Sequence, residues 1–292
     1  MKPFGDRVAD AVAATGTCAV VGLDPHLDRL PAALRAQFEG KSGMAYLEAA
    51  AGAVVEFNRM VIDGLVGVVP AVKPQFAFYE ALGTPGWEAL TETCRMAHAA
   101  GLLTIGDAKR GDISSTGAAY ARAILDPDGP LGLDSVTLNP WMGMDTLDPW
   151  LGICESYGRG VFVLVRTTNP GSSMLQHHGS PAAAECVADA LHTAGANTQG
   201  DSGFSSVGAV VGATAGEDAA SLRARMPQAW FLVPGVGAQG GDADDAVAGA
   251  RADGMGCLVN SSRGVLFGAG EEEDPAGAIA QRARAHAARF VI

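Results

Sequence analysis

The sequence Leu102-Leu103-Thr104-Ile105-Gly106-Asp107-Ala108-Lys109-Arg110-Gly111-Asp112 passes from an apolar run directly into a cluster of charges. A short apolar run of this kind is typical of a strand buried on both faces, as in a parallel sheet covered by helices. In α/β barrels, catalytic residues lie at the carboxyl ends of the strands. The stretch therefore predicts a strand over Leu102 to Asp107 that ends in a catalytic site.

Seven further apolar runs recur along the chain, separated by Ala-rich stretches of helical character. The predicted strands are Cys18 to Leu23, Pro70 to Lys73, Leu102 to Asp107, Ser135 to Leu138, Gly160 to Val165, Val207 to Val211, Trp230 to Val233 and Gly256 to Val259. Eight strands alternating with helices predict an α/β fold, a (βα)8 TIM barrel, as a single domain over residues 1–292. An open doubly wound sheet is disfavoured because no Gly-x-Gly-x-x-Gly follows the first strand and polar clusters follow nearly every strand.

The charge balance limits the partners. The chain has 20 Lys plus Arg against 32 Asp plus Glu, a net charge of -12, which suits neither DNA nor RNA as a polymer. A small phosphorylated substrate is still possible, since it needs only one Arg and a few backbone amides. The start, Met1 to Arg7, has charges where a signal peptide would be apolar, and no apolar stretch is long enough to span a bilayer. We expect a cytoplasmic protein without membrane contact.

Charged residues at the predicted strand ends indicate the chemistry of the site. Asp107 and Lys109 are two apart, so on an extended strand both side chains point to the same face and can touch. Lys73, at the end of the neighbouring strand, could approach the same carboxylates, including Asp112. A buried ion-pair network without catalytic role is the alternative, but so many charges cost too much desolvation to be a common stabilising device.

Two loops near the end of the chain predict an anion site. Gly-rich residues from Pro234 to Gly241 follow the seventh predicted strand, and Ser261-Ser262-Arg263-Gly264 follows the eighth. Such loops form the usual phosphate site of these barrels, where backbone amides and the Arg263 guanidinium would bind a dianion. His26 and the pair His177-His178 lack the spacing of metal ligands, so no metal is expected.

These residues resemble the orotidine 5'-phosphate decarboxylase family, in its longer bacterial, type 2 form. The resemblance rests on motifs spread over most of the chain: Gly22-Leu23-Asp24, Lys73-Pro74, Asp107 to Ile113 with Thr116, Asn169-Pro170-Gly171, Pro234 to Gln239, and Arg263. Asp-x-Lys-x-x-Asp alone indicates only the superfamily. Lys73 and the two phosphate loops make the resemblance specific.

The resemblance implies decarboxylation of orotidine 5'-phosphate to uridine 5'-phosphate and CO2, the last step of de novo UMP biosynthesis, without metal or organic cofactor. Lys109 would protonate C6 as CO2 leaves, and Asp107 would orient Lys109. The remaining implied assignments are Asp24 and Lys73 at the ribose hydroxyls and in the charge network, Thr168 near the pyrimidine where many relatives have Ser, Pro234 among the substrate-binding residues, and Gln239 and Arg263 at the phosphate.

The resemblance also implies a homodimer, in which Asp112 and Thr116 reach into the partner's site. For Ser114, Ser115 and Thr116 a simple helix-capping role is equally open. The closest alternative function is a magnesium-dependent sugar-phosphate decarboxylase or aldolase of the same superfamily. Those relatives carry a metal-binding acid near the second strand, where this chain has Lys73, a cation that would repel a divalent metal. A third reading, a non-catalytic nucleotide-binding barrel, is disfavoured because Lys109 and Asp107 are both present.

Overall fold

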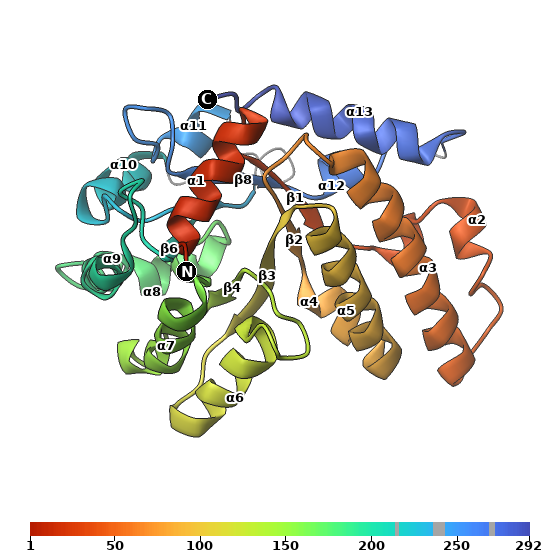
Figure 1. Cartoon of the computed structure of the whole chain (residues 1–292), viewed down its shortest axis with the longest axis horizontal. Coiled ribbons are helices and arrows are strands. Elements are labelled where there is room, and N and C mark those ends of the chain that lie inside the picture. Colours follow the sequence, from red (N-terminus) through yellow and green to blue (C-terminus); the bar gives the residue numbers. More distant parts are fainter. Residues whose placement is uncertain (214–215, 236–242, 269–271) are drawn as a thin grey trace.

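The computed structural model describes residues 1–213, 216–235, 243–268 and 272–292. In this part of the chain, eight parallel strands pair in sequence order and close into a barrel surrounded by helices (Figure 1). The strands are β1 Ala19–Leu23, β2 Ala71–Pro74, β3 Leu103–Arg110, β4 Ser135–Leu138, β5 Gly160–Arg166, β6 Val207–Val211, β7 Phe231–Val233 and β8 Cys257–Ser261. The predicted (βα)8 barrel is confirmed, and every predicted strand is present within a few residues of its expected ends.

Helical segments connect the strands and cover the barrel. They are α1 Phe4–Thr15, η1 Leu27–Arg29, α2 Ala32–Arg35, α3 Gly43–Leu65, α4 Phe76–Glu80, α5 Gly83–Ala99, α6 Ser114–Leu125, η2 Met144–Leu147, α7 Asp148–Tyr157, η3 Pro170–Ser172, α8 Ser173–Gln176, α9 Ala183–Gly195, η4 Ala196–Thr198, α10 Gly216–Arg225, α11 Ala243–Val247, α12 Arg263–Leu266 and α13 Pro275–Ala287. Among the described helices, none is both long and apolar enough to cross a bilayer.

Residues alternate between the two faces of each strand, which divides the core in two. Side chains such as Val20, Ile105 and Phe162 fill the inside of the barrel. Their neighbours, such as Val21 and Val136, pack outward against the helices. Because both faces are apolar, the strands read as continuous apolar runs in the sequence.

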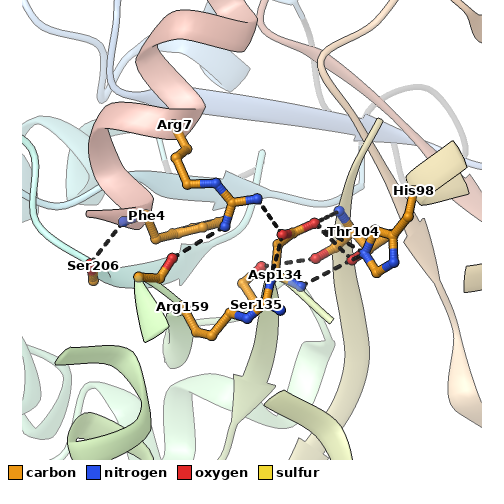
Figure 2. A network of polar contacts seen from close by, with 9 residues as sticks. Phe4, Arg7, His98, Thr104, Asp134, Ser135, Arg159 and Ser206 are labelled. Atoms are coloured by element: carbon orange, nitrogen blue, oxygen red, sulfur yellow. Dashed lines mark hydrogen bonds and ion pairs between the residues drawn. The ribbon is translucent and has the colours of Figure 1, made fainter. Parts of the chain in front are cut away.

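The amino ends of the strands are closed by α1 and by a buried ion network (Figure 2). Asp134, just before β4, is 2% exposed and pairs with Arg7 of α1 and with Arg159, whose Nη1 is 2.8 Å from Asp134 Oδ1. Thr104 of β3 donates its backbone N–H to Asp134 Oδ2 at 2.9 Å, and His98 Nε2 lies 3.4 Å from the same oxygen. These contacts join α1 and three consecutive strands at the end of the barrel remote from the predicted site.

Candidate active site

A cavity of about 780 Å³ opens at the carboxyl ends of the strands. This volume falls in the range of about 300–1,000 Å³ that is usual for small-ligand pockets. Its floor is apolar, formed by Leu164, Val210 and Leu232 inside the barrel, whereas its walls combine polar and apolar side chains. The predicted site residues that line it are Asp24, Lys73, Asp107, Lys109, Thr168, Pro234 and Arg263.

The centre of the polar lining is the Asp107 carboxylate, which has four side-chain partners: Lys73, Gln75, Lys109 and Thr137. Its Oδ2 accepts a hydrogen bond from Lys73 Nζ at 2.7 Å and another from Gln75 Nε2 at 2.8 Å. Its Oδ1 accepts from Lys109 Nζ at 2.5 Å. The predicted contacts of Lys73 and Lys109 with Asp107 are confirmed.

Electrostatics keep Asp107 and Lys73 charged. Burial alone would raise the pKa of Asp107, but Lys73 and Lys109 overcome it and hold that pKa well below its usual range. Burial likewise would lower the pKa of Lys73, yet the charges of Asp107 and Asp24 raise it. The site therefore presents a fixed sequence of positive, negative and positive charges, which bulk water would otherwise screen.

The backbone at Lys109 differs from the extended strand that was expected. Gly106 pairs with Val136, and Arg110 with Leu138, so three residues of β3 lie opposite the single residue Thr137 of β4. Within this bulge Lys109 has a φ of +47°, a left-handed conformation that is uncommon for a residue with a side chain. The Asp107–Lys109 contact thus arises from a bulge, and our reason for predicting it, regular alternation, was wrong.

Two oxygens on the wall between β1 and β8 are buried and have no hydrogen-bond partner among the described residues. They are Asp24 Oδ1 and Asn260 Oδ1. Asn260 is 7% exposed and lies two residues after Leu258, so its side chain is on the same, inner face of β8. Because both residues also line the cavity, these oxygens are acceptors available to a ligand that brings hydroxyl or amide donors.

Thr168 follows β5 and packs against the end of β6. A Cβ atom placed on Gly212 would lie 2.2 Å from the Thr168 Cγ2 methyl, so the absence of a side chain at Gly212 makes room for that methyl. The preceding Thr167 is fixed by Gln176, which accepts its backbone N–H at 2.9 Å and donates to its hydroxyl at 2.8 Å. His177, whose role the sequence left open, has its Nε2 3.1 Å from Asp218 of α10.

The predicted phosphate loops are described only in part. Pro234 and Gly235 follow β7 and line the cavity, as does the exposed Arg263 at the start of α12. No described carboxylate forms an ion pair with the Arg263 guanidinium. Gln239 and the glycines at 237, 240 and 241 lie outside the described residues.

Asp112 and Thr116 lie away from this cavity. Asp112 is half-buried and accepts the backbone N–H of Ile113 at 2.8 Å, while Thr116 is exposed in the first turn of α6. The expected convergence of Asp112 with Lys73 and Lys109 therefore does not occur within one chain. Nor does a Ser or Thr cap this helix, because its N-cap is Ile113 and has no side-chain hydrogen bond.

Three polar residues of the site had no role assigned from sequence. Gln75 is two residues beyond Lys73 and stood in the polar cluster after the second strand, so its position was a usable signal. Asn260 likewise opened a polar cluster. Thr137, inside the predicted strand Ser135 to Leu138, gave no signal, because a threonine is an ordinary strand residue.

The fold and the cavity define a class, the (βα)8-barrel enzymes with a lysine–aspartate–lysine charge network at the strand ends. Among the described residues, no group of three or more His, Cys, Asp and Glu side chains is placed to hold a metal ion. The family model described as "Orotidine 5'-phosphate decarboxylase / HUMPS family" matches residues 56–280. The chain belongs to this family.

Comparison with individual proteins of the family narrows the resemblance further. The chain is 42% identical to the orotidine 5'-phosphate decarboxylase of Rhodopirellula baltica over 94% of this chain and 91% of that protein. It is 40% identical to that of Clostridium perfringens strain 13, over 93% and 91%. The solved structure of the Leishmania donovani OMP decarboxylase superposes with a TM-score of 0.74 at 34% identity, and the match covers 98% of both chains.

Proposed function

We propose that this protein decarboxylates orotidine 5'-phosphate to uridine 5'-phosphate and CO2, the last step of UMP biosynthesis. The observation that carries the proposal is the Lys109 ammonium, held 2.5 Å from Asp107 at the wall of a cavity large enough for a nucleotide. Relatives of about 40% identity over nearly the whole chain are named for this reaction. The barrel fold, the charge network and the family membership all support this reaction.

In the proposed reaction the bond between C6 and its carboxylate breaks, and the electron pair stays on C6. No ring position delocalises that pair, so the developing charge must be stabilised from outside the substrate. The Lys109 ammonium supplies this stabilisation and then transfers a proton to C6. Asp107 orients Lys109, and because its pKa is held low it remains an anion throughout.

The remaining lining residues support nucleotide binding. In the proposed complex, Arg263 binds the phosphate together with Gln239, and Pro234 lies beside them. Asp24 and Lys73 contact the ribose hydroxyls, for which the unpartnered Asp24 Oδ1 is a suitable acceptor. Thr168 lies against the pyrimidine. Phosphate binding far from C6 contributes energy that can hold the ring against Lys109.

The related magnesium-dependent sugar-phosphate chemistry is less compatible with the charge network. A divalent cation at Asp107 would have to displace Lys73, whose Nζ is buried 2.7 Å from the carboxylate. The reaction proposed for this chain uses no metal and no organic cofactor.

The test is decarboxylation of orotidine 5'-phosphate, followed by loss of its ultraviolet absorbance, with and without excess chelator. We expect the same rate in both, and a loss of several orders of magnitude in Lys109→Ala. An activity abolished by the chelator would favour the magnesium-dependent alternative. Tight binding of uridine 5'-phosphate without turnover would instead indicate a non-catalytic nucleotide-binding protein.

We further propose that the protein acts as a homodimer in which Asp112 and Thr116 complete the partner's site. Apolar side chains are exposed next to these two residues, at Ile113, Tyr120, Trp141 and Met142, and Trp141 is 73% exposed. Arg110 accepts the N–H of Asn139 at its carbonyl, 2.8 Å away, so the segments after β3 and β4 lie side by side. Exposed apolar groups at the rim of a cavity are typical of a surface covered by another subunit.

A further inference from the structure

The bulge that carries Lys109 is held by one hydroxyl. Thr137 of β4 is 1% exposed, and its Oγ1 accepts the backbone N–H of Ala108 at 3.0 Å and that of Lys109 at 2.9 Å. In a regular sheet consecutive N–H groups point to opposite sides of the strand and pair with carbonyls of the two neighbouring strands. Here the ladder skips three residues of β3, so Thr137 takes the place of the missing acceptor.

The same hydroxyl also reaches the catalytic carboxylate. Thr137 Oγ1 is 3.1 Å from Asp107 Oδ1, the oxygen that binds Lys109 Nζ. The other acceptor within reach is the carbonyl of Gly106, at 3.5 Å, which is a poorer distance. Since two N–H groups already point at the oxygen, its own hydrogen is left to be donated, and the charged oxygen of Asp107 is the stronger acceptor.

We propose that Thr137 is a positioning residue for Lys109 and Asp107. By binding the backbone of Lys109 and the carboxylate of Asp107 at once, its hydroxyl fixes the direction of the ammonium relative to the cavity. A left-handed backbone at a residue with a long side chain is unfavourable and persists only where its surroundings impose it. Thr137 therefore acts through Lys109 and Asp107.

This inference rests on the proposed function, and Thr137→Val tests it because valine keeps the shape and removes the hydroxyl. We expect kcat for orotidine 5'-phosphate to fall on the order of 10²-fold, the effect of a small misplacement of a catalytic group. Thr137→Ser is the matched control, since it keeps the hydroxyl, and should retain most of the activity. Thr137→Cys, a weak donor, should fall between the two.

The affinities for two ligands distinguish a positioning role of Thr137 from a merely structural one. Uridine 5'-phosphate has only hydrogen on C6, whereas an analogue with an anionic oxygen on C6 interacts directly with Lys109. Thr137→Val should lower the affinity for the analogue by about the same factor as kcat. It should leave the affinity for uridine 5'-phosphate nearly unchanged. Equal weakening of both ligands would show a merely structural role and overturn the proposal, as would a wild-type kcat in Thr137→Val.

The decarboxylation assay and the two affinities also test this inference and the proposed function separately. If the wild-type protein did not decarboxylate orotidine 5'-phosphate, the proposed function would fail in that measurement alone. If Thr137→Val did not fold, Thr137→Cys would carry the same comparison against Thr137→Ser, and unchanged selectivity for the analogue in Thr137→Cys would then count against the proposal.

Discussion

Charged side chains interrupt apolar strands at Lys73, Asp107 and Lys109, and this interruption made them recognisable from sequence. Their contacts depend on features with a weaker signal. The Lys109 backbone is turned by a bulge, and Thr137, which holds the bulge, looks like any strand residue. Sequence therefore predicts Lys73, Asp107 and Lys109 as members of the charge network, whereas the backbone that orients them becomes visible only in three dimensions.

Asn260 permits a prediction in which binding and stability change in opposite directions. Its Oδ1 is buried in the unliganded protein without a described partner, which costs free energy, and a nucleotide hydroxyl would satisfy it. Asn260→Leu should raise the unfolding temperature of the unliganded protein while weakening uridine 5'-phosphate binding by roughly tenfold, the equivalent of about 1.4 kcal/mol. Calorimetry of unfolding and of binding measures both. A variant that binds as tightly as the wild type would show that Asn260 does not accept a hydrogen bond from the nucleotide.

At the level of elements, the apolar runs located all eight strands. Short helices such as α4, Phe76–Glu80, were not predicted, because five residues are too few to display helical periodicity. Strand ends were also displaced: β3 continues to Arg110, three residues past its predicted end. That extension is what brings Lys109 into the sheet.

The junction of α1 with the strands predicts a pH dependence of stability. Burial would raise the pKa of Asp134, but the hydrogen bond with His98 and the charge of Arg7 hold it well below its usual range. The resulting stabilisation is complete above the ordinary aspartate pKa of about 3.9 and is lost as the pH falls below it, because the unfolded chain then binds a proton that folded Asp134 does not.

Asp134→Asn should lower the free energy of unfolding at pH 7 by roughly 3–5 kcal/mol, because it leaves Arg159 and Arg7 without their buried counter-charge. The variant should also lose less stability than the wild type between pH 5 and pH 3. Urea unfolding at several pH values measures both effects. Lys2→Ala, which removes an exposed ion pair with Asp10, is the control and should change little. Parallel acid profiles for Asp134→Asn and the wild type would contradict this account.

For the whole molecule, the proposed dimer predicts complementation between two inactive variants. Lys109→Ala keeps Asp112, and Asp112→Ala keeps Lys109. In a mixed dimer, one site would then receive Lys109 from its own chain and Asp112 from the partner, so co-expression should restore activity to about a quarter of the wild-type level if chains associate at random.

A mixture of Lys109→Ala with Lys73→Ala is the matched control. Both residues belong to the same chain's charge network, so every site in that mixture lacks one of them and activity should remain absent. Restoration in the control, or its absence in the Lys109→Ala and Asp112→Ala mixture despite dimers in sedimentation, would refute the shared site.

The contact between Thr168 and Gly212 constrains the order in which this pocket can change over evolution. With threonine at 168, any side chain at 212 collides with its methyl; with serine there, the nearest remaining atom is the Thr168 backbone nitrogen at 3.4 Å. Gly212→Ala alone should therefore impair nucleotide binding, whereas Thr168→Ser followed by Gly212→Ala should be tolerated, as binding assays of the three variants would establish. In a protein with threonine at 168, that residue therefore has to change before Gly212 can acquire a side chain.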